Sequence, residues 1–194
     1  MATTVRSHKG IWPVIDPSVF VDPAAVIIGD VLIGQDSSVW PFSVIRGDMH
    51  RIRIGKRVSV QDGSVLHITH ASAYNPDGFP LTIGDDVTIG HQATLHGCTI
   101  HDRVLIGMKA MVMDGAIVES DVILGAGAVV PPGKVLASGH VYLGNPAKAV
   151  RAITAKEKSY FIYTAANYAQ LKDIHRAEAG TALPPEKGKS LFTR

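Results

Sequence analysis

Aliphatic residues recur along most of this chain at every sixth position. A small or β-branched residue usually follows four positions after each of them. An amphipathic helix would repeat at about 3.6 residues and a half-buried strand at 2, so neither accounts for the pattern. A period of six is the signature of a hexapeptide β-helix. The repeated positions are Ile15, Val21, Ile27, Ile33, Val39, Ile45, Ile54, Val60, Leu66, Ile83, Ile89, Leu95, Ile100, Ile106, Val112, Val118, Leu124, Val130 and Leu136.

The repeat predicts a parallel β-helix over residues 15–146. Each six-residue unit should form one short strand and one turn, and three units should complete a triangular coil. Successive coils then stack at about 4.8 Å, the ordinary spacing of neighbouring strands. The 19 repeated positions, at three per coil, indicate six to seven coils.

The period is interrupted twice. Residues 69–82 are rich in Pro, Gly, Asn and Asp and contain no repeat position, so they are predicted to leave the β-helix as an excursion loop. The step from Ile45 to Ile54 is three residues too long, which indicates a smaller bulge that contains His50 and Arg51.

Four segments follow from this reading: a lead-in over 1–14, the β-helix over 15–146, a helical segment over 147–180 and a loose tail over 181–194. The turn Gly144-Asn145-Pro146-Ala147-Lys148 should lead into the helix. Thr154 and Glu157 have the spacing of a capping box, and Gly180 is a good stop. An apolar stripe at helical spacing should pack along the β-helix. Its members are Tyr160, Tyr163, Leu171 and Ile174.

The register places two histidines together. Leu66 and Leu95 are three units apart once the excursion is set aside, which is one full coil. His67 and His96, each directly after its aliphatic residue, should therefore stack on one outer face, with Arg46 at the head of the same column. About 4.8 Å between backbones lets two imidazoles converge on one cation.

A second polar group should lie on a different edge. Gln61 and Asp62 follow Val60, which lies one coil above Ile89, and His91 sits two places after Ile89. A threefold assembly would bring this edge against the histidine column of a neighbouring chain. Three neutral imidazoles with one open position are the ligand set of a catalytic zinc site. An all-imidazole site also accepts Fe²⁺ or Co²⁺.

Simpler roles exist for these residues. Arg46 and Asp62 can form a plain interface ion pair, Asp48 can brace Arg46, and Gln61 can cap a turn. An isolated outward histidine on a β-helix is usually solvated, which is the reading we give to His8, His101, His140 and His175. His50 and His70 flank the predicted site, and we read them as solvated loop residues as well.

Composition excludes several classes of function. With 46% hydrophobic and 19% charged residues, the chain has the composition of a soluble globular protein. A net charge of +2 without a run of Lys or Arg predicts no nucleic-acid or membrane partner. Cys98 is the single cysteine, and the N-terminus lacks the apolar core of a secretory signal. A cytoplasmic location is therefore expected.

The motifs WPFSVIRGD, SVQDGSVLH, IGHQATLHGC, LIGMKAMVMDGA and GNPAK resemble those of the γ-class carbonic anhydrase-like proteins of bacteria over about residues 10–175. The resemblance implies a left-handed parallel β-helix that forms a homotrimer with a metal between subunits. It implies His67 and His96 as ligands from one subunit and His91 as the ligand from its neighbour. Arg46 and Asp62 correspond to the intersubunit ion pair, and Gln61 to the residue that orients a metal-bound hydroxide.

One departure from that family concerns proton transfer. Asp48 matches the acid of the family's RGD motif, but Met49 follows it where founding members carry acidic residues nearby. The metal-bound water must lose a proton in each turnover, so other residues would have to carry that proton away. His70 and Tyr74 in the excursion are candidates for proton transfer, and Tyr142 is a candidate for the pocket wall.

These observations predict a metal-dependent hydratase that converts CO₂ to bicarbonate, and the missing acidic residues near Asp48 predict a low activity. Hexapeptide β-helices also carry acyl transfer, so an acyltransferase or CoA-thioester hydrolase is the alternative, typically with one histidine as general base between subunits. A third reading is a non-catalytic trimeric scaffold stabilised by its metal.

Overall fold

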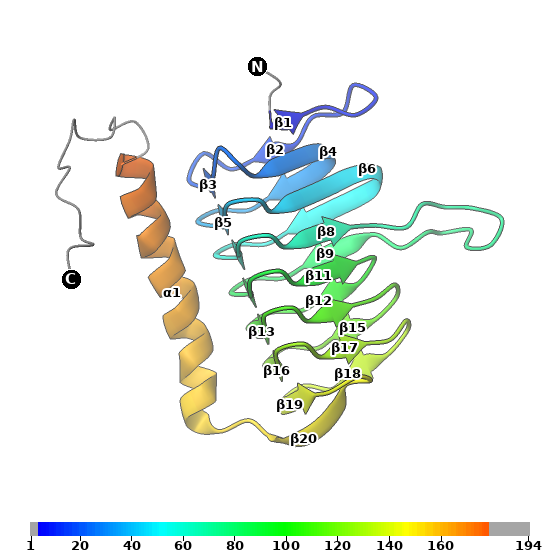
Figure 1. The fold of residues 1–194 in the computed structure, drawn as a ribbon, viewed down its shortest axis with the longest axis vertical. Helices are drawn as coiled ribbons and strands as arrows, with labels where there is room; N and C mark the ends of the chain where they lie inside the picture. The colour runs from blue at the N-terminus through cyan, green and yellow to red at the C-terminus, as the bar shows by residue number, and fades with distance from the viewer. Residues whose placement is uncertain (1–3, 179–194) are drawn as a thin grey trace, which may run out of the picture.

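The repeat folds into a triangular β-helix, described here from a computed structural model for residues 4–178 (Figure 1). The first face consists of parallel strands closed by an antiparallel one. Its strands are β3 (Phe20–Val21), β5 (Ser38–Val39), β7 (Ser59–Val60), β10 (Thr88–Ile89), β13 (Val104–Ile106), β16 (Val122–Leu124), β19 (His140–Leu143) and the antiparallel β20 (Lys148–Ala152).

The second and third faces are joined in one sheet because β4 (Val26–Ile33) and β6 (Val44–Ile54) run across the corner between them. The second face, which we call the histidine face, continues through β1 (Val5–Arg6), β8 (Val65–His67), β11 (Thr94–His96), β14 (Met111–Val112) and β17 (Val129–Val130). The third face continues through β2 (Val14–Ile15), β9 (Leu81–Ile83), β12 (Thr99–Ile100), β15 (Ile117–Val118) and β18 (Val135–Leu136).

The predicted core is confirmed. From Ile27 to Leu136 every sixth-position aliphatic residue is buried, with an exposed fraction of 2% or less. The stack has about eight turns, more than the six to seven expected. Part of the difference lies in residues 1–14, which we expected to be a lead-in: Val5 pairs in parallel with Ile27 and so adds a strand at the N-terminal end.

Both interruptions of the period appear where the sequence places them. Residues 69–80 leave the β-helix as a hairpin-like excursion, with antiparallel bridges between Thr69 and Phe79 and between Ser72 and Asn75. Leu81 and Thr82, which were expected in the excursion, already belong to β9 and pair with Ile52 and Arg53. In β6 the pairing with β4 passes from Gly47 directly to Ile52, and residues 48–51 bulge outward. This bulge forms part of the surroundings of the histidines.

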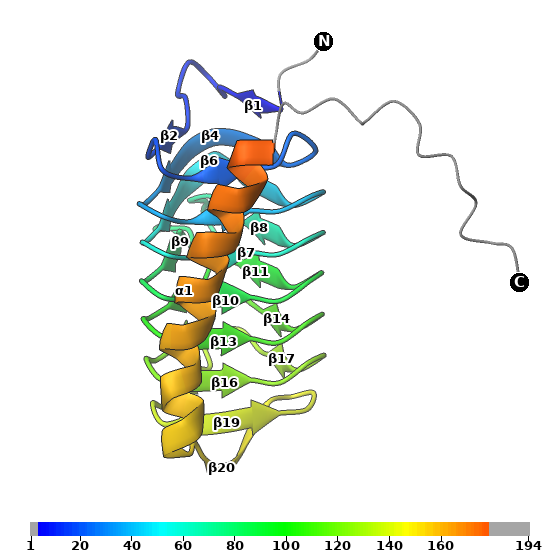
Figure 2. The same cartoon turned by 90° about the vertical axis from the view of Figure 1, so that its left-hand side faces the viewer.

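The segment after residue 146 differs from the expectation of a helix over 147–180. Residues 148–152 first form β20 against β19, and the helix α1 (Ala155–Glu178) starts only afterwards. It runs along the first face from the β20 end toward β3 (Figure 2). The expected tail lies outside the described residues. Among residues 4–178, no helix is long and apolar enough to cross a membrane.

The face of α1 that packs on the β-helix is not the predicted apolar stripe. Tyr160, Tyr163 and Ile174 are at least half exposed. The buried side chains of α1 are Phe161, Thr164, Ala165 and Lys172. Small residues at two of these positions let the helix approach the sheet closely. Because one of the four buried side chains is a lysine, a search for hydrophobic residues at helical spacing does not identify this face of α1.

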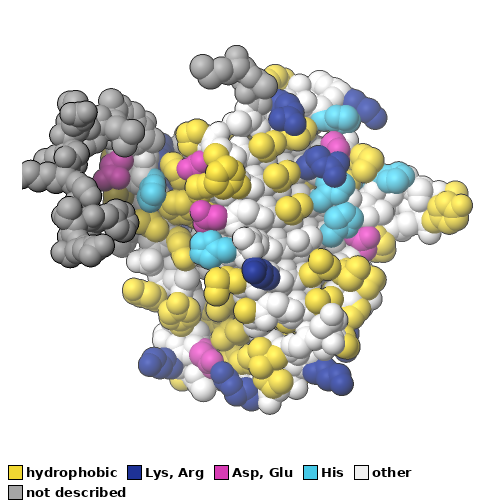
Figure 3. Space-filling view, viewed as in Figure 1, with side chains coloured by type: hydrophobic (Ala, Val, Ile, Leu, Met, Phe, Trp, Pro, Cys, Tyr) yellow, Lys and Arg dark blue, Asp and Glu magenta, His cyan; other side chains and the backbone are white. Residues whose placement is uncertain are grey.

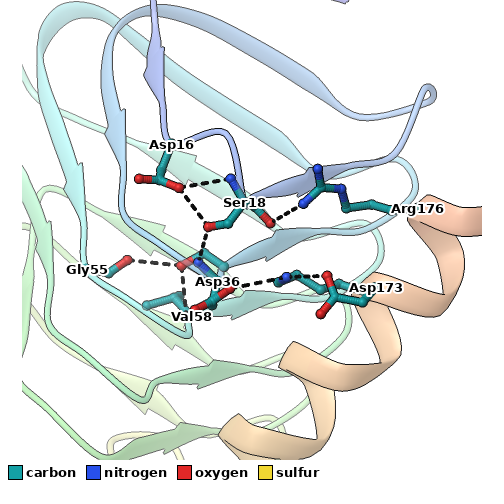
Figure 4. A network of polar contacts seen from close by, with 9 residues as sticks. Asp16, Ser18, Asp36, Gly55, Val58, Asp173 and Arg176 are labelled. Carbon is teal, nitrogen blue, oxygen red and sulfur yellow. Dashed lines mark hydrogen bonds and ion pairs between the residues drawn. The ribbon is translucent and has the colours of Figure 1, made fainter.

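Polar contacts attach the C-terminal end of α1 to the first turns of the β-helix (Figure 4). Arg176 donates to the Ser18 carbonyl at 2.9 Å. The buried Lys172 ammonium lies 3.3 Å from Asp36 and 2.7 Å from Asp173. His175, expected to be merely solvated, packs edge-on against the Trp40 ring at a centroid distance of 5.0 Å. These contacts hold the C-terminal end of α1 beside β3 and β5, which precede the histidine-bearing strands β8 and β11 in the chain.

The other end of α1 carries the predicted capping box. The Thr154 backbone N–H donates to Glu157 Oε2 at 2.8 Å, and the Glu157 N–H donates to Thr154 Oγ1 at 3.2 Å. Arg151 adds two hydrogen bonds to the Glu157 carboxylate, at 2.7 and 2.8 Å. The two bonds from the Thr154 and Glu157 N–H groups satisfy backbone donors that the helix itself leaves unpaired.

These contacts predict a pH dependence of the helix start. The Arg151 hydrogen bonds, with the Thr154 N–H, lower the pKa of Glu157 from 4.5 to about 2. A depressed folded-state pKa means that the stabilisation is complete above about pH 4.5 and is lost as the pH falls through about 2. Glu157→Gln should therefore accelerate amide exchange in the first turn at pH 7, and the difference from wild type should disappear near pH 2. An equal difference at both pH values would contradict this account.

Candidate metal centre

Two histidines meet on the histidine face at the register the repeat predicts. Leu66 pairs with Leu95, and His67 pairs with His96 in the next rung. The Nδ1 atom of His67 lies 3.0 Å from Nε2 of His96. His67 is 9% exposed and sits in the wall of the β-helix, whereas the His96 side chain is 35% exposed and faces partly toward solvent.

A carboxylate supports the remaining nitrogen of each ring. Asp48, in the β6 bulge, places Oδ1 3.2 Å from His67 Nε2. Asp114 places Oδ1 2.6 Å from His96 Nδ1, and its other oxygen accepts from Thr69 Oγ1 at 2.9 Å. Carboxylates in this position fix the tautomer and orientation of metal-ligating imidazoles. Asp114 was not identified from the sequence.

The two facing nitrogens form an incomplete site by themselves. With the outer nitrogens of His67 and His96 donating to their carboxylates, the inner nitrogens of the neutral rings both present lone pairs. Two lone pairs 3.0 Å apart repel unless a proton or a cation lies between them. In a tetrahedral Zn²⁺ site each imidazole nitrogen lies about 2.05 Å from the metal, which places two such nitrogens about 3.3 Å from each other. The donor set therefore fits a divalent metal.

The surroundings of His67 favour its neutral form. Burial lowers the pKa of His67, and the hydrogen bond to Asp48 only partly offsets this, while the Arg46 charge lowers it further. Burial alone would raise the pKa of Asp48, but hydrogen bonds from Arg46 and His67 hold it below its usual range. The Arg46–Asp48 contact is 2.5 Å within the chain. A neutral imidazole beside an ionised carboxylate is the state that binds metal.

His91 lies on a different edge, as its register indicates. Val60 pairs with Ile89, so Gln61 and Asp62 lie in the coil above Gly90 and His91. His91 Nδ1 is 2.9 Å from Asp62 Oδ2, and both side chains are nearly half exposed. Within the described part of a single chain, no three His, Cys, Asp or Glu side chains converge as a metal site.

Gln61 is held by the C-terminal helix. Gln61 is 5% exposed and lies beside Tyr168 of α1. Burial raises the pKa of the Tyr168 hydroxyl, so this group stays protonated. Both residues border a hollow of about 210 Å³ together with His91. Tyr168 was not identified from the sequence, because its role depends on where α1 docks.

Comparisons with known proteins identify the family of the chain. The family model for the bacterial transferase hexapeptide (six repeats) matches residues 97–132, and the hexapeptide repeat of succinyl-transferase matches residues 80–108. Protein YrdA of Escherichia coli is 49% identical over 184 residues, which cover 95% of this chain and 100% of YrdA. Gamma carbonic anhydrase 3, mitochondrial, of Arabidopsis thaliana is 38% identical over 182 residues, covering 94% of this chain and 70% of that protein. The chain belongs to the γ-carbonic anhydrase-like family of hexapeptide-repeat proteins.

Solved structures with the same fold include transferases by name. A crystal structure of a putative acetyltransferase from Bacillus cereus superimposes with a TM-score of 0.83 at 36% identity, covering 89% of this chain and 96% of that one. The γ-carbonic anhydrase-like fold of the chain is therefore shared with proteins that carry a different activity in their names.

Tyr142 does not border the site of this γ-carbonic anhydrase-like chain. It is 6% exposed within the hydrophobic core, and its hydroxyl donates to the Ala137 carbonyl at 3.1 Å. Tyr142 lies in β19, near the C-terminal end of the stack, and pairs with Leu124 of β16. Its predicted place in the pocket wall is wrong, because the strand register turns its ring inward.

His70 and Tyr74, the candidates for proton transfer, lie on the excursion. Tyr74 is fully exposed, and His70 is exposed as well. Among residues 4–178 of this γ-carbonic anhydrase-like chain, neither residue forms a hydrogen bond or ion pair with His67 or His96, so their role stays a prediction.

Proposed function

We propose that this chain is a metal-dependent carbonic anhydrase that hydrates CO₂ at the interfaces of a homotrimer. The observation that carries the proposal is the His67–His96 pair, whose inner nitrogens face each other while carboxylates hold the outer ones. Zn²⁺, or Fe²⁺ or Co²⁺, in a site of three imidazoles with one open position would lower the pKa of a bound water to about 7 and so supply the nucleophile.

The third ligand in this proposal is His91 of a neighbouring chain. On one chain His91 and the His67–His96 pair lie on different edges, and threefold symmetry brings unlike edges of neighbouring chains together. The exposure of His91 leaves its imidazole accessible to a neighbour. Asp62, 2.9 Å from its Nδ1, would then orient it as Asp48 and Asp114 orient the other two.

Gln61 would orient the reacting water in this site. Its amide is buried beside His91, and Tyr168 restrains it from the side of α1. A neutral amide can accept from or donate to an oxygen nucleophile without adding charge to the site. Bicarbonate would leave through the open edge of the interface, and the released proton would pass to buffer.

One sample tests the function. Metal content and CO₂ hydration should be measured on the same anaerobically purified protein, which avoids loss of Fe²⁺. We expect about one divalent ion per chain and a hydration rate that falls with chelation. Bound metal without hydration would instead support a scaffold. Release of free thiol from acetyl-CoA, supported by the named acetyltransferase among the structural relatives, would support acyl transfer or thioester hydrolysis.

The Gln61→Ala variant should keep its metal and its trimer but hydrate CO₂ about 10–100-fold more slowly. This corresponds to the loss of one hydrogen bond to a charged group, worth about 1.5–3 kcal/mol. The control is Gln35→Ala, because Gln35 is exposed at a different corner. Unchanged kinetics in metal-loaded Gln61→Ala protein would reduce this residue to a structural one.

Asp114→Asn should weaken metal affinity about 10–100-fold while leaving the fold intact, since a carboxylate that orients a ligating imidazole typically contributes that much. The affinity is measured by competition with a chromogenic chelator. Asp102→Asn is the matched control, because Asp102 accepts a backbone N–H at another corner of the coil. Equal metal affinity in the two variants would contradict the role assigned to Asp114.

A further inference from the structure

Three departures from the hexapeptide repeat meet around one cavity at the N-terminal end of the histidine face. These are the turn closed by paired backbone hydrogen bonds between His8 and Ile11, the β6 bulge over 48–51, and the root of the excursion at Ala71. The cavity has a volume of about 390 Å³. A regular β-helix needs none of these irregularities, so their convergence requires an explanation.

The bulge is built into the chain and is not a loose loop. Gly29 pairs with Gly47 and Val31 pairs with Ile52, so four residues of β6 lie opposite Asp30 alone. A Cβ atom added at Gly29 would lie 2.3 Å from the Gly47 carbonyl oxygen, and Gly29 has a φ of +78°. Glycine is therefore required where the two strands separate. The backbone is shaped to project residues 48–51 outward.

The cavity is cationic. Its two carboxylates are already neutralised from outside, Asp30 by Arg53 at 2.7 Å and Asp48 by Arg46. Lys9 and Arg51 also line it, and among residues 4–178 neither side chain has an acidic partner within ion-pair distance. Figure 3 shows basic and histidine side chains gathered at this end of the face.

Two histidines and an apolar wall complete the lining. The imidazoles of His8 and His50 border the cavity. His50 Nδ1 accepts the Arg51 backbone N–H at 2.8 Å, and its Nε2 donates to the Asp77 carbonyl at 3.3 Å, so this ring is fixed in the wall of the cavity. Ile11 and Met49 also line it, each about half exposed. One side of the cavity thus offers positive charge and N–H groups, and the other offers hydrophobic surface.

We infer that this cavity binds a small organic oxyanion, a carboxylate or phosphate head group on a short apolar body. The Arg51 guanidinium suits the planar or tetrahedral oxygens of such a group, and Lys9 adds a point charge. The volume lies at the lower end of the range for small-molecule sites. The inference does not depend on the proposed hydratase activity, because binding is expected in metal-free protein too. Since Asp48 borders both sites, an anion bound here lies one side chain away from His67.

Binding of four probes to the full-length protein tests the inference: inorganic phosphate, butyrate, butyl phosphate and the neutral alcohol 1-butanol. Titration calorimetry is run on metal-free and metal-loaded samples. Butyl phosphate should bind most tightly, ahead of inorganic phosphate, and 1-butanol should not bind. Butyrate and butyl phosphate share an apolar body, so the difference between their affinities identifies the preferred head group. Affinity should fall as salt is added, because exposed charges are screened.

Variants locate the site. Lys9→Ala and Arg51→Ala should each weaken butyl phosphate about tenfold or more, and the double variant should abolish binding. Lys56→Ala removes an exposed cation at another corner and should leave the affinity unchanged. Thermal unfolding verifies that all variants fold. Failure of every anion to bind with a Kd below about 10 mM, or equal affinity in the double variant and Lys56→Ala, would overturn the inference.

Discussion

Mixing His67→Ala chains with His91→Ala chains should restore metal binding that neither variant shows alone. Each homotrimer lacks one ligand at all of its interfaces, and two imidazoles rarely retain a divalent metal against chelators. In a mixed trimer, an interface is complete when the His91→Ala chain supplies the His67–His96 pair and the His67→Ala chain supplies His91. With random assembly from equal amounts, about a quarter of the interfaces meet this condition.

The control is a mixture of His67→Ala with His96→Ala chains. These two ligands lie on the same face of one chain, 3.0 Å apart, so no arrangement of the two variants completes an interface. Metal content and CO₂ hydration should stay at background in this mixture. If mixed trimers of the first pair form, as native mass spectrometry would show, and metal binding does not return, the ligands do not come from two chains.

The main features of the β-helix follow from the sequence because one coil contains three repeat units. That arithmetic alone places Leu66 over Leu95, and hence His67 over His96, before any side-chain contact is known. It also places His91 and the His67–His96 pair on different edges of the chain. The same arithmetic located the β6 bulge, since a spacing of nine residues cannot be absorbed within a strand pairing of period six.

The remaining features depend on side-chain direction and on docking, which periodicity does not determine. Asp114 precedes a glycine in a turn, and its contact with His96 depends on the path of that turn. The buried side of α1 includes Lys172, which reads as a solvent-facing residue until Asp36 is brought beside it. Tyr142 was placed near the site from its position beside the GNPAK turn, whereas the register turns it into the core.

Arg46 and Asp62 should show strong energetic coupling in trimer dissociation. Within one chain they have other partners: Arg46 contacts Asp48, and Asp62 contacts His91 at 2.9 Å. Their side chains are 40% and 47% exposed, so both remain accessible to a neighbouring chain. Removing one member of an ion pair buried by assembly leaves an unpaired charge and costs about 3–5 kcal/mol. We therefore expect Asp62→Ala and Arg46→Ala each to dissociate the trimer at concentrations where the wild type stays assembled.

A double-mutant cycle on the trimer distinguishes this pair from two independent contacts. Sedimentation should show that the double variant is no weaker than either single variant, and metal should be lost in step with dissociation. Asp48→Ala serves as the control for the contact within the chain, because it removes a partner of both Arg46 and His67 but leaves Asp62 in place. It should lower metal affinity and keep the trimer. Additive losses in the cycle, or dissociation caused by Asp48→Ala alone, would show that Arg46 acts within its own chain and that the interface is held by other residues.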